Sequence, residues 1–128
     1  MAVWWDGDLS RELLDKIYID KWTGNGTTRL FNGKGKGITW CNGTKATPCL
    51  SADIFGDWRE EVIWPTVDGR EIRIYMTDKP TEHCITTLMQ DPIYRIGVAT
   101  ENTGYNQTPE PGFYFGTDKV GFKGFHYK

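Results

Sequence analysis

Two short acidic loops carry the residue types that bind hard metal ions. In each loop carboxylates surround a glycine, at a spacing that differs from that of an EF-hand. Calcium takes roughly six to eight oxygen ligands, which short acidic loops supply, and the glycine lets the backbone curl round the ion. We expect Ca²⁺ at both loops, although carboxylates solvated in β-turns beside Arg11 and Arg59 would give the same pattern. The candidate ligands are Asp6, Asp8 and Glu12 in the first loop, and Asp53, Asp57 and Glu61 in the second.

Two polar loops carry side chains suited to a carbohydrate. Residues 41–48 combine an amide, a hydroxyl and the amine of Lys45, which can hydrogen-bond to sugar hydroxyls and pair with a uronate. Residues 102–107 form a second polar loop that contains Tyr105. Each has a simpler interpretation, a surface turn for the first loop and a packing residue for the tyrosine. The candidate sugar-binding residues of the first loop are Asn42, Gly43 and Thr44.

The histidines and cysteines point to no zinc site. His83 and His126 stand apart from any Cys or Asp at ligand spacing. Cys41 and Cys49 are separated by eight positions and could form a disulfide across a loop, which would leave Cys84 unpaired. Three free thiols fit the sequence equally well, so cysteine usage assigns no compartment.

Composition excludes several classes of protein. The 128 residues include 15 Lys and Arg against 17 Asp and Glu, for a net charge of −2. This balance argues against a binder of nucleic acid or of an anionic membrane surface. A mean hydropathy of −0.53, without a long apolar run, predicts no transmembrane helix. The 6 Trp, 6 Tyr and 6 Phe argue against disorder, and from the residues after Met1 we expect no signal peptide.

Short strands joined by glycine-rich connections dominate the predicted elements. Helical periodicity is weak, and its best candidate, 9–14, is short. The Asp-Gly pair at 68–69 predicts a tight turn before 70–77, where apolar and polar side chains alternate. This pattern is typical of an all-β sandwich, barrel or propeller. The expected strands are 16–22, 27–31, 50–54, 60–64, 70–77, 94–100 and 113–115.

A short internal repeat favours the propeller. Residues 7–13 match 56–62, with Gly-Asp followed by three residues, an acid and an aliphatic in both copies, at an offset of 49. About 50 residues is the length of a four-stranded propeller blade. We therefore divide the chain into blade-like repeats at 1–50 and 51–116, the second with an active-site-type loop, and a tail at 117–128. Two blades cannot close a ring, so we expect this chain to be part of a larger propeller.

The sequence resembles the rhamnogalacturonan lyases of polysaccharide lyase family 11. Its most specific block is Ser-Ala-Asp-Ile-Phe-Gly-Asp-Trp-Arg-Glu-Glu-Val-Ile at 51–63. The resemblance implies the C-terminal part of an eight-bladed β-propeller with bound calcium, which cleaves the rhamnose–galacturonate backbone of pectic rhamnogalacturonan I. It also implies a secreted, cell-surface or periplasmic parent protein. The other matching stretches are 5–9, 11–14, 42–50, 87–92, 94–95, 105–107 and 111–114.

The resemblance also implies a reaction and its residues. In the family, an Asn-Gly-Thr-Lys loop and a later tyrosine line the central cleft, and these match 42–45 and Tyr105. The chemistry would be β-elimination, in which a cation beside the uronate stabilises the enolate-like intermediate. Lys45 would remove the C5 proton or pair with the uronate, and Tyr105 would donate to the leaving oxygen or orient the sugar.

A second interpretation fits the same residues. A non-catalytic, calcium-stabilised propeller repeat that binds glycan or protein explains the acidic loops without requiring Lys45. In either case, the exposed strand edges of two isolated blades predict self-association.

Overall fold

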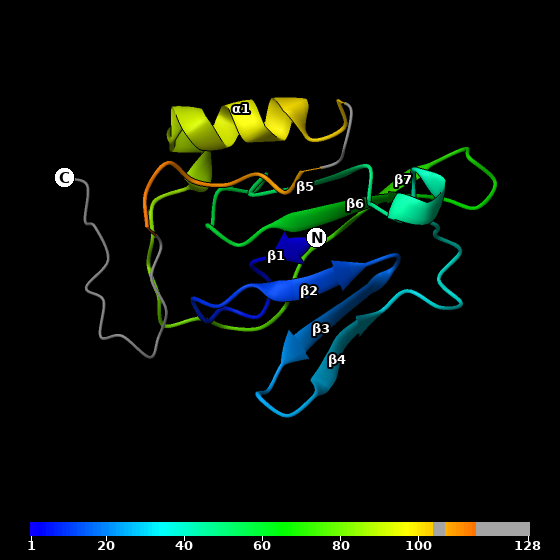
Figure 1. Ribbon diagram of the computed structural model, residues 1–128, viewed down its shortest axis with the longest axis horizontal. Coiled ribbons are helices and arrows are strands. Elements are labelled where there is room, and N and C mark those ends of the chain that lie inside the picture. The colour runs from blue at the N-terminus through cyan, green and yellow to red at the C-terminus, as the bar shows by residue number, and fades with distance from the viewer. Residues whose placement is uncertain (104–106, 115–128) are drawn as a thin grey trace.

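Two small antiparallel sheets and one helix form the described part of the chain. The structure is a computed structural model, and it describes residues 1–103 and 107–114. Figure 1 shows the sheets lying side by side, with helix α1 running along the outer side of the second sheet. Within the described residues, no helix has the length and apolar character needed to cross a membrane.

The first sheet has four consecutive antiparallel strands. The β2–β3 turn places Lys16 in the left-handed region, at φ 55°, and β4 leads into Gly33, whose N–H donates to the Ile17 carbonyl at 2.9 Å. A Cβ at position 33 would lie 2.8 Å from that carbonyl oxygen, so this close approach requires glycine. The strands are β1 (Ala2–Val3), β2 (Glu12–Asp15), β3 (Tyr18–Trp22) and β4 (Thr27–Asn32).

The second sheet has three antiparallel strands, β5 (Leu50–Ala52), β6 (Glu61–Pro65) and β7 (Ile72–Tyr75). The Asp-Gly turn forms where expected between β6 and β7, with Gly69 at φ 69°. Its Asp68 carboxylate accepts from the Thr66 hydroxyl at 2.6 Å and from the Arg70 N–H at 3.1 Å.

The main core lies between the two sheets. The Phe31 ring of β4 stacks on the Trp64 ring of β6, with centroids 5.3 Å apart and planes 8° apart. Such large apolar rings, removed from water, supply most of the favourable free energy of packing. The buried residues of this core are Val3, Trp5, Leu14, Ile17, Ile19, Ile38, Val62 and Trp64.

Helix α1 (Pro92–Thr100) corrects the strand expected at 94–100. The Asp91 carboxylate caps it by accepting from the Ile93 N–H at 3.0 Å, and Pro92 occupies the first turn, where its missing N–H costs nothing. The one fully buried helix side chain, Tyr94, joins a second core with Trp4, Leu9, Trp58 and Leu88. The all-β prediction therefore holds for the sheets and is wrong for this segment.

The structure differs from the sequence pattern at two further segments. Residues 9–14, the best helical candidate, contribute instead to β2, because Glu12 and Leu14 are buried while Leu13 is exposed, the alternation of a strand. Phe113 and Tyr114, expected in a strand, are irregular, and Phe115 lies outside the described residues. The propeller and the division into repeats remain predictions, because the two sheets do not close on each other or on further sheets.

Candidate functional site

The predicted sugar-binding residues form a tight, exposed turn. Helix η1 (Gly43–Lys45) is flanked by Asn42 and Ala46, both left-handed at φ 58° and 53°. Its base is closed by a two-bond bridge: the Cys41 N–H donates to the Thr47 carbonyl at 2.7 Å, and the Thr47 N–H donates back at 3.2 Å. The side chains of Asn42, Thr44 and Lys45 are exposed. The turn therefore presents an amide, a hydroxyl and an ammonium from a fixed backbone.

The turn is anchored to the main core through the β2–β3 turn. The Lys16 N–H donates to the Ala46 carbonyl at 3.0 Å, and the buried Trp64 indole N–H donates to the Lys16 carbonyl at 2.8 Å. The Trp40 indole N–H donates to the Gly43 carbonyl at 3.0 Å. All three bonds are accepted by backbone carbonyls, and none of them uses the side chain of Thr44 or Lys45. The Asn42 amide, by contrast, donates to the Thr47 hydroxyl at 3.3 Å, within the turn.

Tyr105 lies outside the described residues. The segment that leads to it begins beside β5 of the second sheet. The Glu101 carboxylate accepts from the Ser51 N–H at 3.0 Å, and the Asn102 side chain donates to the Cys49 carbonyl. Sequence analysis missed Glu101, whose partner lies fifty positions earlier.

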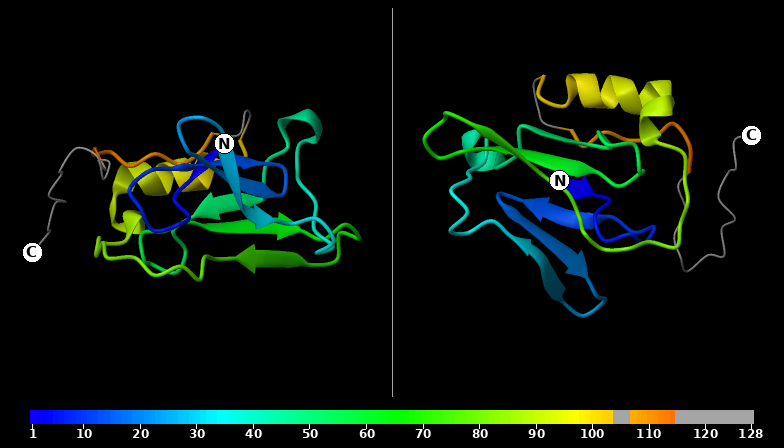
Figure 2. Two further views of the ribbon diagram at one scale, coloured as in Figure 1. Left: turned by 90° about the horizontal axis from the view of Figure 1, so that it is seen from below. Right: turned by 180° about the vertical axis from the view of Figure 1, so that it is seen from behind.

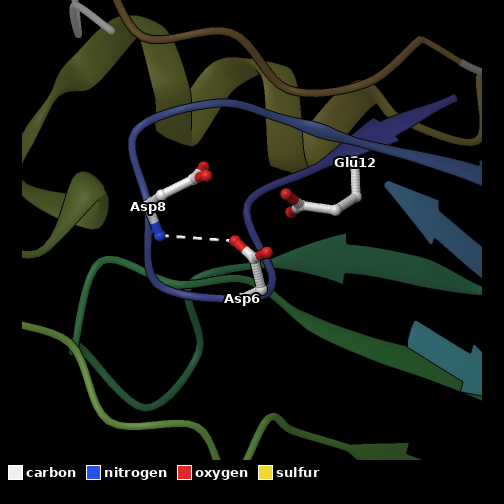
Figure 3. Close-up of side chains that lie close together, drawn as sticks. All are labelled: Asp6, Asp8 and Glu12. Carbon is white, nitrogen blue, oxygen red and sulfur yellow. Dashed lines mark hydrogen bonds between the residues drawn. The ribbon is translucent and has the colours of Figure 1, made fainter. Parts of the chain in front are cut away.

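The first acidic loop does bring its three carboxylates together. Asp6, Asp8 and Glu12 each offer an oxygen within 4.8 Å of the others, and Figure 3 shows them facing one space. Lys21 of β3 reaches into that space, with its Nζ 2.7 Å from Asp6, 2.5 Å from Asp8 and 3.1 Å from Glu12. Sequence analysis missed this ammonium, which already neutralises part of the cluster.

Burial and charge act in opposite directions within this cluster. Burial raises the pKa of Glu12 to about 7. The Trp5 N–H, which donates to the Glu12 carboxylate at 2.7 Å, acts in the opposite direction and lowers that pKa, but burial is the larger effect. Burial also disfavours the charged form of Lys21, but hydrogen bonds to the three carboxylates outweigh it and raise the Lys21 pKa. The ammonium is therefore held in its charged form.

The second acidic loop does not bring its carboxylates together. Asp53 accepts from the Gly56 N–H at 2.8 Å and from the Thr87 hydroxyl at 2.7 Å. Asp57 pairs with Arg59, and Glu61 accepts from two backbone N–H groups. Each carboxylate is thus occupied by a different protein partner. In the described part of the chain, the first loop alone forms a cluster of three possible metal ligands.

The two loops nonetheless share a local structure. Gly7 and Gly56 both have positive φ, at 94° and 79°. Glu12 and Glu61 each begin a strand and accept from a backbone N–H seven residues earlier. The sequence repeat therefore reflects a repeated turn, and the loss of the cluster in the second copy follows from Phe55, which stands where the first copy has an acid.

The acidic loops and the η1 turn lie at opposite ends of the sheets. The loops precede β2 and β6, whereas η1 precedes β5, which runs antiparallel to β6. Figures 1 and 2 show this separation in all three views. The all-oxygen first loop fits calcium in donor type. An ion there would stabilise the turn, away from the η1 side chains.

Cys41 and Cys49 flank the η1 turn with their Sγ atoms 3.6 Å apart. All three cysteines are free thiols, and burial beside Cys41 raises the pKa of Cys49 to about 11. We predict that oxidised glutathione will convert this pair into a disulfide, because the two thiols already lie close together. In this exchange the thiols lose two protons and two electrons, and the glutathione disulfide is reduced to two molecules of glutathione. Mass spectrometry should show the 41–49 link, and Cys84→Ser should leave it intact. A crosslink involving Cys84 instead would contradict the prediction.

Buried glutamates with raised pKa values predict an unusual pH dependence of stability, and three of them have the largest shifts. Burial raises the pKa values of Glu12, Glu60 and Glu101 from 4.5 to about 7 in the folded state. The folded state therefore binds these protons more tightly than the unfolded state. This contribution is full below about pH 4.5 and is lost as the pH rises through about 7.

We expect the Tm to be at least about 4 °C higher at pH 5 than at pH 8. Thermal melts over this range check the prediction, and Glu101→Gln should reduce the slope because it removes one of the titrating groups. A Tm that rises with pH over the same range would contradict it.

Comparison with known proteins relates the chain to rhamnogalacturonan lyases. The model of rhamnogalacturonan lyase family 11, C-terminal domain, matches residues 1–122. The rhamnogalacturonan endolyase YesW of Bacillus subtilis (strain 168) is 53% identical over 117 residues, covering 90% of this chain and 18% of that protein. The exolyase YesX of the same organism is 49% identical over 124 residues, covering 91% of this chain and 20% of that protein.

Solved structures agree with these relatives. The crystal structure of YesW matches with a TM-score of 0.86 at 51% identity, over 92% of this chain and 20% of that one. A rhamnogalacturonan lyase of Bacillus licheniformis matches with a TM-score of 0.82 at 56% identity, over 88% of this chain and 19% of that one. The chain spans about a fifth of the length of the relatives that it matches. It belongs to rhamnogalacturonan lyase family 11, as a C-terminal domain of that family.

Proposed function

We propose that this chain supplies the C-terminal part of a lyase that cleaves the rhamnose–galacturonate backbone of pectin. The exposed turn at 42–45, anchored by backbone hydrogen bonds within a family 11 domain, is the observation that carries the proposal. The relatives' names include an endolyase and an exolyase, so the site of cleavage along the polymer is left open.

The proposed reaction is β-elimination at a galacturonate residue. The C5 proton leaves to a base, a C4–C5 double bond forms, and the C4–O bond to rhamnose breaks as the leaving oxygen takes a proton. Lys45 is the base or the partner of the C6 carboxylate, while Asn42 and Thr44 hydrogen-bond to sugar hydroxyls. Tyr105 is proposed to protonate the leaving oxygen or to orient the sugar.

The proposal is tested most directly in a chimera. This chain replaces the matching segment of YesW, and the purified chimera is assayed on rhamnogalacturonan by absorbance of the unsaturated uronate. We expect activity within about tenfold of the parent, because the segments are half identical and share one fold. A folded chimera that binds the polysaccharide without cleaving it would favour the non-catalytic, glycan-binding repeat.

We also propose that the parent protein is a secreted, cell-surface or periplasmic propeller. Its pectic substrate is an extracellular polymer. The exposed side chains of Ile72 and Ile74 lie on β7, at the edge of the second sheet, and the exposed Met76 follows directly after it. An apolar edge of this kind is what a neighbouring blade would cover, and in the isolated chain it favours self-association.

Calcium is proposed as a structural ion at the first acidic loop. When bound, it would neutralise the charge of these carboxylates; in its absence Lys21 neutralises part of that charge. We predict that Lys21→Met will destabilise the calcium-free chain by about 2 kcal/mol or more, because it leaves three carboxylates crowded together. Excess calcium should restore most of that loss, and should raise the Tm of the variant more than that of the wild type.

Thermal melts with EDTA and with calcium measure both effects. Lys34→Met, at an exposed loop position, is the matched control and should change neither melt. Equal calcium shifts in the wild type and in Lys21→Met would contradict the placement of the ion at this loop.

A further inference from the structure

An exposed tryptophan and a lysine stand beside the η1 turn. The Trp40 side chain is 38% exposed, and its indole N–H is bound to the Gly43 carbonyl. The Lys16 ammonium lies 5.7 Å from the centroid of the Trp40 ring. The two residues come from different parts of the chain, and the proposed elimination uses neither of them.

Both residues are held in place. The hydrogen bond to Gly43 fixes the Trp40 ring against the turn, so the ring stays exposed without rotating freely. Lys16 adopts φ 55°, a conformation in which a lysine carries a cost, and its backbone bonds to Ala46 and Trp64 hold it there. The left-handed φ of Lys16 is the conformation that the two-residue β2–β3 turn requires, since Asp15 pairs with Tyr18. The backbone of Lys16 is therefore fixed beside an exposed aromatic ring, while its ammonium is carried on a longer side chain.

We propose that Trp40 and Lys16 form a further sugar-binding subsite next to the 42–45 turn. This proposal rests on the proposed function. An indole face packs well against the apolar face of a pyranose, and the 6-methyl group of rhamnose adds apolar surface. An ammonium pairs with the carboxylate of the adjacent galacturonate. The alternation of deoxy sugar and uronate in the polymer matches the pairing of ring and ammonium.

The contact between Lys16 and the ring leaves the ammonium available. At 5.7 Å it lies at the outer limit of a cation–π interaction, which at an exposed site is weak. A carboxylate can therefore draw the ammonium away at little cost. The subsite is contiguous with the turn through Gly43 and Ala46, so one oligosaccharide can occupy both.

Titration of the chain with rhamnogalacturonan oligosaccharides, followed by NMR of the tryptophan indole N–H signals, tests the subsite. The Trp40 signal is identified as the one missing in Trp40→Phe. We expect this signal to shift on binding, and Trp40→Ala to raise Kd about tenfold, whereas Trp22→Ala should not change it, although Trp22 is 60% exposed.

Lys16→Gln tests the ammonium without disturbing the ring. We expect it to raise Kd about threefold or more for the native oligosaccharide, and to have no effect when the uronates are reduced to neutral sugars. Lys34→Gln is the matched control and should bind both probes normally. Melting curves confirm that each variant is folded.

The outcomes separate this proposal from the function on which it rests. Wild-type binding that neither Trp40→Ala nor Lys16→Gln weakens would overturn the subsite and leave the proposed function standing. Loss of affinity in Lys16→Gln for both the native and the reduced probes would overturn the carboxylate assignment. A wild-type chain that binds neither probe would overturn the subsite together with sugar binding at the turn.

Discussion

Replacing Lys45 by alanine in the YesW chimera is expected to lower kcat at least about a hundredfold. Lys45 ends helix η1, and its side chain is exposed at the surface of the turn. The hydrogen bonds described above hold the turn through Gly43, Ala46 and Thr47 and do not use the Lys45 side chain, so we expect the alanine variant to fold normally. The loss would therefore report chemistry or charge pairing, and product absorbance measures it.

Lys45→Arg separates the two roles proposed for this residue. Arginine keeps the positive charge but does not act as a base, because its guanidinium remains protonated. Recovery of most of the activity would assign Lys45 to the uronate carboxylate, and no recovery would assign it to the proton. Lys34→Ala, which removes an exposed lysine from another loop, should leave kcat unchanged. Full activity in Lys45→Ala would remove Lys45 from the site.

The features that the sequence predicted correctly are local ones. The Asp-Gly turn before β7 depends on side chains within five positions, and the repeated Gly-Asp motif marks a turn that recurs in the structure. Helix α1 was equally local. Its start at Asp91 and Pro92 is a standard capping signal, and the strand predicted at 94–100 does not take that signal into account.

Long-range partners could not be predicted in this way. Lys21 enters the acidic cluster because β3 pairs antiparallel with β2, with Leu13 opposite Asp20. Trp40 meets Lys16 because the η1 turn docks on the β2–β3 turn. No spacing in the sequence encodes either contact, and both depend on sheet register and packing. The acidic residues were recognised by type, and the structure decided which of them converge.

Glu60→Ala is expected to destabilise the chain by about 3–5 kcal/mol. The Glu60 carboxylate is 1% exposed, and it accepts from the Trp4 N–H at 2.9 Å and from the Tyr94 hydroxyl at 2.7 Å. The Arg11 guanidinium lies 3.7 Å away. Alanine would leave two buried donors without this partner, and a cavity where the first acidic loop, the second loop and helix α1 meet.

Glu60→Gln identifies the part of this cost that is due to charge. Burial raises the pKa of Glu60 to about 7, so the ionised carboxylate is less favoured in the folded state than in water. Glutamine keeps the shape and one acceptor, and we expect it to cost about 1 kcal/mol or less at pH 8. Urea unfolding measures both variants, with Glu71→Ala, at an exposed site, expected within about 0.5 kcal/mol of the wild type. Equal losses in Glu60→Gln and Glu60→Ala would contradict the expectation that the shape and one acceptor of glutamine preserve most of the stability.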